Sequence, residues 1–297
     1  TAYRRQRQMC IRDRFMEPGD EIIVTEIEHH ANIIPWQMVA QENGYELKYI
    51  KINDDFTLDL DDLNEKLSSK TKVVSIVGES NLSGLLPDIK EITKLVREKT
   101  ESILIIDGAQ LVPHRKIDVQ DLGIDFLVFS GHKMLGPTGI GVVWGKKEIL
   151  ENMEPVYGGG DMIEEVFYDN ATWAPIPHKF EAGTPPYVEA IGLGAAIDYL
   201  NKIGMKNVES HSDELREYGK KLFSDIENVN VIHSSAEKAG CTFGMYVENV
   251  HATDLSLMLD THGVAVRSGH HCVQPVSYTH LRAHETSLHL VCRLLLE

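Results

Sequence analysis

Short apolar runs that alternate with amphipathic helical stretches place the strongest constraint on how this chain can fold. Apolar runs predict strands at residues 21–25, 46–50, 73–77, 103–106, 126–129 and 141–145. Helical patterns lie between the early strands, at residues 60–67 and 89–99. Because strands that alternate with helices are typical of parallel sheets, we predict an α/β fold with a large, mainly parallel-sheet domain.

The second half of the chain has a different pattern. The predicted elements are helices at residues 188–203, 207–226 and 254–261 and strands at residues 229–232, 242–247 and 264–266. Chains of 297 residues commonly divide into two domains. We therefore expect a large domain over residues 15–187 and a smaller C-terminal α+β domain over residues 188–275.

The two ends differ in character from the rest of the chain. Residues 1–14 and 276–297 resemble translated sequencing-adapter sequence, and we predict that both are non-native segments, leaving both domains incomplete. A basic N-terminal arm and a short C-terminal helix are the alternative. Cys10 and Cys292 fall in these segments, so Cys241 and Cys272 remain, without a disulfide framework or zinc-ligand spacing.

Charge and hydropathy exclude some classes of partner. The net charge of −16 argues against a nucleic-acid binder, which needs basic residues to displace phosphate counterions. No apolar run is long enough to cross a bilayer, and the polar, arginine-rich start lacks the apolar core of a signal peptide. We expect a cytoplasmic protein with no membrane partner.

Two charged residues follow neighbouring predicted strands. Asp107 comes directly after residues 103–106, and Lys133 follows residues 126–129. Ligands of open α/β sheets bind outside the carboxyl ends of the strands. Pyridoxal phosphate needs a lysine for its aldehyde and a carboxylate for its ring nitrogen. Either residue alone has a simpler interpretation, as a surface charge or a helix cap, but the pair together indicates this cofactor.

Other polar groups lie near these positions in the sequence. Ser130 and His132 flank the lysine, and the glycine-rich residues 136–141 follow, where a phosphate could bind. A glycine-rich turn alone is weak evidence. Cys272 follows His270 and His271, whose positive charge would favour a reactive thiolate; an unreactive loop cysteine is the equal alternative. Cys241 begins an alternating strand pattern, which predicts a buried, inert thiol.

Five ordered motifs resemble the SUF-type (group II) cysteine desulfurases, which are class V aminotransferase-like, pyridoxal-phosphate-dependent enzymes. The motifs are Glu28-His29-His30-Ala31-Asn32, Asp107-Gly108-Ala109-Gln110, Ser130-Gly131-His132-Lys133, Phe180-Glu181-Ala182-Gly183-Thr184-Pro185 and Arg267-Ser268-Gly269-His270-His271-Cys272. The resemblance covers residues 15–275 and implies the type I fold of pyridoxal-phosphate-dependent transferases. The sequence departs from the family in two ways. It lacks the N-terminal part that supplies a helix start for phosphate binding, and it lacks the segment after Cys272 that carries an arginine for the substrate carboxylate. Arg293 is not a substitute for that arginine.

The resemblance implies roles for the cofactor-binding residues. Lys133 would hold pyridoxal phosphate as a Schiff base, Asp107 would pair with the ring nitrogen, and Gln110 would contact the phenolic oxygen. His29 would stack on the ring and transfer protons; without the resemblance, it is better interpreted as a helix-start residue. The residues expected at the phosphate are Ser130, His132 and, reaching the neighbouring subunit, Thr184.

Substrate residues and partners follow from the same resemblance. Asn81 would lie near the substrate carboxylate, although asparagine also favours turns. Arg267 is a second substrate-side candidate, and a solvated strand-end arginine is its alternative. Thr184 implies a homodimer, and no metal site is expected.

The implied reaction converts L-cysteine to L-alanine and leaves a persulfide on Cys272. A sulfur-acceptor protein of the SUF system would then take the sulfur for iron–sulfur cluster assembly. L-Selenocysteine is an additional substrate candidate. The alternatives are a selenocysteine lyase, another class V aminotransferase-like enzyme, and an inactive fragment or dimerising scaffold.

Overall fold

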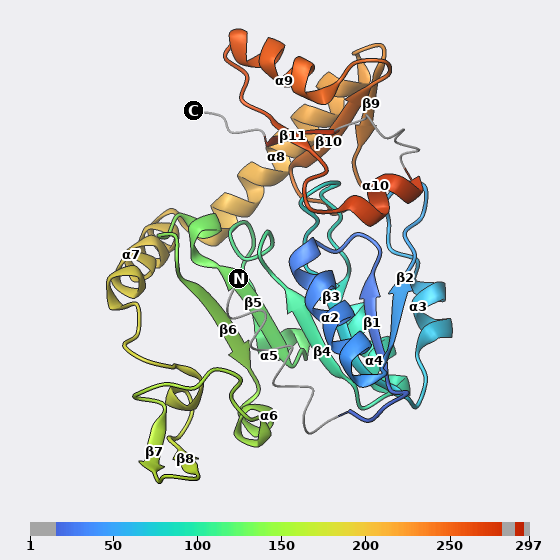
Figure 1. Ribbon diagram of the computed structural model, residues 1–297. Coiled ribbons are helices and arrows are strands. Elements are labelled where there is room, and N and C mark those ends of the chain that lie inside the picture. Colours follow the sequence, from blue (N-terminus) through green and yellow to red (C-terminus); the bar gives the residue numbers. More distant parts are fainter. Residues whose placement is uncertain (1–15, 281–288, 294–297) are drawn as a thin grey trace.

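A six-stranded sheet forms the centre of the molecule, for which a computed structural model describes residues 16–280 and 289–293 (Figure 1). The strands are β1 (Glu21–Thr25), β2 (Glu46–Ile50), β3 (Thr71–Val77), β4 (Ile103–Asp107), β5 (Phe126–Ser130) and β6 (Gly141–Gly145). Their order is β2-β1-β3-β4-β5-β6. The pairings among β1 to β5 are parallel, and β6 runs antiparallel to β5. The predicted mainly parallel α/β sheet is confirmed.

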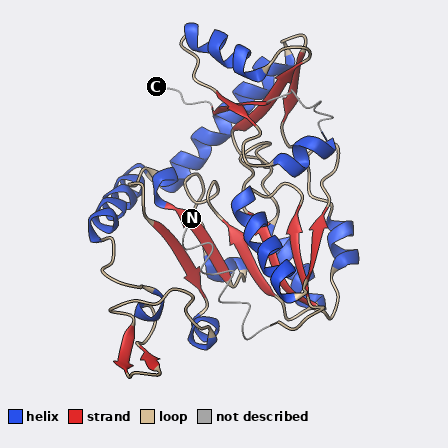
Figure 2. Cartoon of the chain, viewed as in Figure 1, coloured by secondary structure: helices blue, strands red, loops and turns tan. Residues whose placement is uncertain are grey.

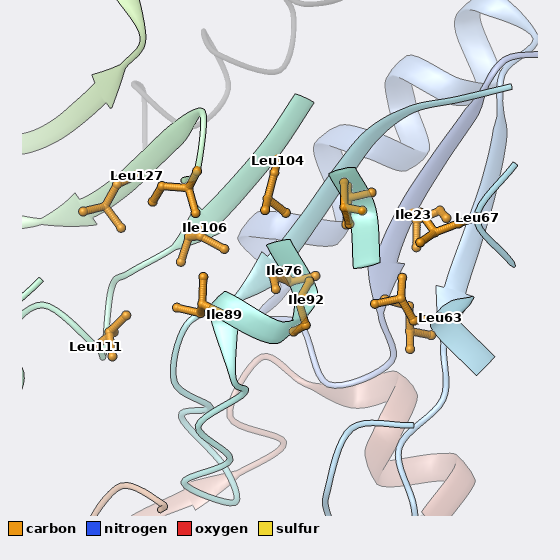
Figure 3. Packing of buried hydrophobic residues seen from close by; sticks show 14 residues of the cluster. Ile23, Leu63, Leu67, Ile76, Ile89, Ile92, Leu104, Ile106, Leu111 and Leu127 are labelled. Carbon is orange, nitrogen blue, oxygen red and sulfur yellow. The ribbon is translucent and has the colours of Figure 1, made fainter. Parts of the chain in front are cut away.

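Helices cover both faces of this sheet (Figure 2). They are α2 (His30–Asn43), α3 (Leu60–Lys66), α4 (Ile89–Lys99), α5 (Val119–Leu122) and α6 (Lys147–Asn152). Successive strand residues point to opposite faces. Ile22 accordingly packs in one buried cluster with Trp36 of α2, while Ile23 packs in another with Ile92 of α4 (Figure 3). Burial on both faces explains why these strands are near-continuous apolar runs.

A second, smaller sheet lies at the other end of the molecule (Figure 1). It contains β9 (Val229–Ile232), β10 (Thr242–Val247), β11 (Arg267–Gly269) and β12 (His289–Arg293), in the antiparallel order β11-β12-β10-β9. The helix α9 (Ala252–Thr261) packs beside it, and α10 (Gln274–His280) follows β11. This arrangement agrees with the smaller α+β unit expected from the sequence. The strand β12 lies within residues 276–297, which we predicted to be a non-native segment. That origin stays a prediction.

Two long helices connect the sheets. They are α7 (Tyr187–Ile203) and α8 (Met205–Ser224), and α8 runs from α7 towards the smaller sheet (Figure 1). Leu193 of α7 packs with Met134 of the large domain. Arg115, which is 8% exposed, binds the carboxylates of Glu209 and Asp213 on α8 at 2.6 and 2.9 Å. These contacts tie the connecting helices to the large sheet, and the predicted boundary at residues 187–188 stays a prediction.

Other elements complete the described residues. They are the 3₁₀ turns η1 (Gly131–Met134) and η2 (His178–Phe180) and the hairpin of β7 (Ile163–Val166) and β8 (Ala171–Trp173). None of the helices in residues 16–280 combines the length and apolar character needed to span a bilayer.

Two local predictions differ from the structure. The predicted strand at residues 264–266 is wrong, because the strand β11 begins at Arg267, where the chain pairs with β12. Val266 instead packs with Met245 and Ala252 under α9. The helix α2 was not predicted, since Pro35 lies inside it and proline usually breaks a helical pattern. In both segments, the secondary structure depends on pairing or packing with residues that are distant in the sequence.

Candidate active site

One pocket opens at the carboxyl ends of β3, β4 and β5. Eight residues line it: His29, Val77, Glu79, Asn81, Asp107, Ala109, Gln110 and Lys133. Val77 and Asp107 are the last residues of β3 and β4, and Lys133 lies in η1, directly after β5. Since β4 pairs with β5, the carboxylate and the lysine do leave neighbouring strands. Five residues singled out from the sequence therefore meet here.

Asp107 combines a pocket position with a local turn. The residue is 4% exposed, and its Oδ1 accepts a hydrogen bond from the backbone N–H of Ala109 at 3.0 Å. This bond stabilises a turn and is not the helix cap that we considered as the alternative, because no helix begins in residues 108–115. It leaves the second carboxylate oxygen to other contacts. The turn therefore orients a buried carboxylate into the pocket.

The short turn η1 sets the position of Lys133. The backbone N–H of Gly131 donates to the carbonyl of Ile140 at 2.9 Å, and a Cβ at Gly131 would lie 2.8 Å from Ile140 Cγ2. Glycine is thus required for the close contact between this turn and the start of β6. Ser130 and His132 flank the lysine, the first half-buried and the second exposed, outside the pocket lining.

His29 starts the helix α2 and also lines the pocket. Its Nδ1 accepts a hydrogen bond from the backbone N–H of Ala31 at 3.0 Å. In the neutral imidazole, an accepting Nδ1 leaves the proton on Nε2. The helix-start interpretation is therefore confirmed, and the same ring lines the pocket. Its predicted stacking on the cofactor and its part in proton transfer stay predictions.

A buried carboxylate next to His29 was not identified from the sequence. Glu28 is fully buried, and its Oε1 accepts hydrogen bonds from Thr25 Oγ1 at 2.8 Å and from the Val77 N–H at 2.6 Å. Its Oε2 accepts a bond from Asn32 Nδ2 at 2.7 Å. The pKa of Glu28 is raised to about 8, mainly by burial and in smaller part by the charge of Asp107, and the three donors oppose the rise. Glu28 begins the motif that contains His29, but nothing in the sequence indicates that its carboxylate is buried.

The loop that carries Cys272 docks beside the pocket. Asn81 Nδ2 donates to the carbonyl of His271 at 2.8 Å, and the backbone N–H of His30 donates to the carbonyl of Cys272 at 2.7 Å. The thiol itself is half-buried. Cys241, in contrast, is buried directly before β10, as predicted. The structure therefore places the Cys272 loop beside the pocket, bound to Asn81 of its lining.

Two predicted residues lie apart from this site. Thr184 is exposed just before α7, and Arg267 is exposed at the start of β11; neither lines the pocket. Their predicted contacts, with a neighbouring subunit and with substrate, stay predictions. Val77, Glu79 and Ala109 line the pocket but were not predicted, although Ala109 belongs to the Asp107 motif. Within the described ranges, no three His, Cys, Asp or Glu side chains form a metal-binding group.

The residues of the pocket suit pyridoxal phosphate. A lysine amine stands at the end of one strand, and a buried carboxylate ends the adjacent strand, as the aldehyde and the ring nitrogen of this cofactor require. The His29 imidazole, the amides of Gln110 and Asn81 and the Glu79 carboxylate are the other polar groups in the lining. The donor set therefore fits the predicted cofactor.

Comparisons with known proteins agree with this geometry. The aminotransferase class-V family matches residues 8–294. The chain is 47% identical over 257 residues to a probable cysteine desulfurase of Streptomyces coelicolor and 43% identical over 259 residues to a cysteine desulfurase of Haloferax volcanii. These alignments cover 86% and 87% of this chain, which spans 61% of the length of each relative.

Solved structures give the same result. A cysteine desulfurase from Escherichia coli superposes with a TM-score of 0.91 at 35% identity, covering 98% of this chain and 71% of that one. A cysteine desulfurase from Thermococcus onnurineus gives a TM-score of 0.92 at 32% identity, covering 99% of this chain and 72% of the other. These similarities confirm the predicted resemblance: the chain belongs to the aminotransferase class-V family.

Proposed function

We propose that this chain is a pyridoxal-phosphate-dependent cysteine desulfurase that converts L-cysteine to L-alanine and carries the sulfur as a persulfide on Cys272. One observation carries the proposal. Lys133 and Asp107 meet in a pocket to which the Cys272 loop is tied through Asn81 and His30. A cofactor site and a candidate sulfur acceptor thus share one location, and the similar desulfurases support this assignment.

The pocket residues divide the work of binding and proton transfer. When bound, pyridoxal phosphate supplies an electron sink for negative charge on the substrate carbon. The Lys133 amine would hold the cofactor and then transfer protons at the substrate carbon. The Asp107 carboxylate would keep the ring nitrogen protonated, and Gln110 would contact the phenolic oxygen. Ser130 and His132 would bind the phosphate.

His29 is proposed to stack on the cofactor ring and to take part in proton transfer, taking up a proton as imidazolium before it gives one back. Since its Nδ1 accepts the Ala31 N–H, the neutral ring presents Nε2–H to the pocket. Asn81 and Arg267 are proposed to contact the substrate carboxylate, as the family resemblance implies. The pocket lining by Asn81 supports its part in this assignment.

Cys272 is proposed to accept the sulfur. Its thiolate would attack the substrate sulfur, forming a sulfur–sulfur bond while the carbon–sulfur bond breaks. The electron pair of the broken bond stays with the substrate carbon, which takes up a proton to give alanine. A sulfur-acceptor protein of the SUF system would then remove the terminal sulfur for iron–sulfur cluster assembly.

We further propose a homodimer. One side of α7 exposes Tyr187, Val188 and Ile191, at 63%, 65% and 72% of their surfaces. Clustered apolar side chains of this kind mark association surfaces. Thr184 lies three positions before this helix, where it would reach the phosphate of a neighbouring subunit. Sedimentation equilibrium of the chain and of Ile191→Asp tests this assignment.

The catalytic proposal has a direct test. The chain is incubated with pyridoxal phosphate, reduced with borohydride and digested, and the labelled lysine is identified by mass spectrometry; alanine release from L-cysteine is measured in parallel. We expect the label on Lys133 and release of alanine. A label on another lysine would overturn the assignment. If Cys272→Ala retained activity on L-selenocysteine but lost activity on L-cysteine, the thiol would be needed for sulfur only.

A further inference from the structure

Three hydrogen bonds hold residues 270–274, here called the Cys272 loop, against the large domain. Asn81 Nδ2 donates to the His271 carbonyl at 2.8 Å, and the His30 backbone N–H donates to the Cys272 carbonyl at 2.7 Å. The third bond runs from the backbone N–H of Gln274 to His30 Nε2, at 3.0 Å. His30 therefore contacts the loop at Cys272 itself and again two residues later, at Gln274.

The loop has a backbone conformation that needs such support. His271 and Cys272 are consecutive non-glycine residues with φ values of 52° and 62°. Side chains with a Cβ rarely adopt this left-handed region, and residues there persist when surrounding contacts hold them. The bonds from Asn81 and His30 are contacts of this kind.

The bond from Gln274 requires a neutral His30 ring. A nitrogen that accepts a backbone N–H has its lone pair available and carries no proton, whereas both nitrogens of a charged imidazole are donors. Burial lowers the pKa of His30, and the charge of nearby His270 lowers it further. Near neutral pH, the ring is accordingly in the form that this bond requires.

We propose that His30 is a positioning residue that holds the Cys272 loop at the pocket, and that protonation of its ring releases the loop. This inference rests on the proposed function for its purpose, because a held loop keeps the sulfur-accepting thiol beside the substrate. A released loop would free the same thiol for transfer to an acceptor.

The groups that face His30 come from two sides. On its own element, His29 has its ring centroid 6.5 Å from that of His30. The loop contributes three groups on the other side. They are His270, whose charge lowers the pKa of His30, the buried His271 and the Cys272 thiol. Because the pKa of His30 is lowered on folding, the loop is fully held above the ordinary histidine value of 6.5. It is released as the pH falls from there through the lowered pKa.

Hydrogen exchange of the intact chain tests the release without any variant. The Gln274 amide is compared with the Gly240 amide, which donates to the Gly84 carbonyl at 2.7 Å and so has no titrating acceptor. Between about pH 7.5 and about pH 5, we expect the protection factor of Gln274 to fall by about tenfold relative to that of Gly240. Equal changes at both amides would overturn the proposal.

Alkylation of Cys272 tests the role of the ring. Peptide mass spectrometry gives the rate for Cys272 alone, and each variant is compared with the intact chain at the same pH. His30→Ala should react several-fold faster at about pH 7.5 and at a similar rate at about pH 5, where the intact loop is already released. His30→Gln should keep the slow rate at both pH values, because an amide oxygen accepts the N–H and does not titrate.

His251→Ala is the matched control. His251 also accepts a backbone N–H at a helix start, from Thr253 at 3.3 Å, but on the exposed end of α9. In this variant, the rate of Cys272 alkylation should equal that of the intact chain at every pH. A constant ratio, across pH, between the Cys272 alkylation rates of His30→Ala and of the intact chain would overturn the proposal, since a purely structural role predicts that result. Absence of alanine release with the expected exchange result would contradict the proposed function alone.

Discussion

The cofactor pocket and the Cys272 loop are built in different ways. Asp107 and Lys133 stand at the ends of buried strands whose register is fixed by five-stranded parallel pairing. Cys272 follows β11, a strand of three residues, and its loop is held by hydrogen bonds to the large domain. The sheet thus sets the geometry of the pocket, whereas docking sets the position of the thiol. Loss of the thiol should leave cofactor binding intact.

The largest effect is expected from Lys133→Ala. In the proposed function, removal of the amine takes away both the covalent link to the cofactor and the proton carrier, so turnover should fall by about a thousandfold or more. The fold should remain, because Lys133 is half-buried in a short turn. Alanine release and circular dichroism provide the measurements. Lys94→Ala, at a side chain 75% exposed on α4, is the control and should leave turnover unchanged.

A smaller loss is expected from Asp107→Asn. The amide can still accept the Ala109 N–H, but it cannot hold a proton on the ring nitrogen, so turnover should fall by about a hundredfold while cofactor stays bound. Cofactor absorbance and steady-state rates give both quantities. Asp118→Asn changes a helix cap that accepts the N–H groups of Gln120 and Asp121. Equal rates for the two variants would mean that Asp107 only stabilises its local turn.

Glu28→Gln should change how stability depends on pH. The pKa of Glu28 rises from 4.5 to about 8 on folding, so the folded state binds more protons between these values. The contribution of Glu28 to the stability of the intact chain is therefore greatest below about pH 4.5 and is lost as the pH rises towards 8. Glutamine removes this loss, which amounts to at most about 1.4 kcal/mol per pH unit.

Urea unfolding at about pH 5 and about pH 8 measures this effect. The free energy of unfolding of Glu28→Gln, relative to the intact chain, should rise with pH. Glu98→Gln, on the exposed face of α4, should show no such trend. A constant difference between Glu28→Gln and the intact chain would show that Glu28 has the same charge state throughout this range.

Cys241→Ala should have the smallest effect. The side chain is buried, so the loss of its sulfur should cost about 1 kcal/mol of stability through packing. Alanine release should stay at the rate of the intact chain. Unfolding and activity measured on the same preparation separate the two quantities, and a lost activity would place Cys241 in the reaction.

The sequence predicts the two halves of the site to different degrees. Asp107 and Lys133 could be predicted to meet, since each directly follows a strand pattern and parallel strands end at one edge of the sheet. The hydrogen bonds of the Cys272 loop could not, because they join residues 190 and 244 positions apart. Such contacts depend on how the two sheets dock. The unpredicted helix α2 supplies His29 and His30, and Pro35 hides its pattern.

The burial of Glu28 was also outside what the sequence could predict. A glutamate beside two histidines reads as a solvated group, because charged side chains are seldom fully buried. Its burial depends on donors from three places, Thr25, Asn32 and the end of β3. Charge states in the site therefore require the folded geometry.

The division of labour between pocket and loop is tested most directly by peptide mass spectrometry after a single turnover. The chain is loaded with pyridoxal phosphate, mixed with one equivalent of L-cysteine and digested without reductant. We expect one additional sulfur on the peptide that contains Cys272 and none on the peptide that contains Cys241. Cys272→Ala should bind the cofactor normally yet form no persulfide. A persulfide on Cys241, or alanine formed by Cys272→Ala at the rate of the intact chain, would contradict the account.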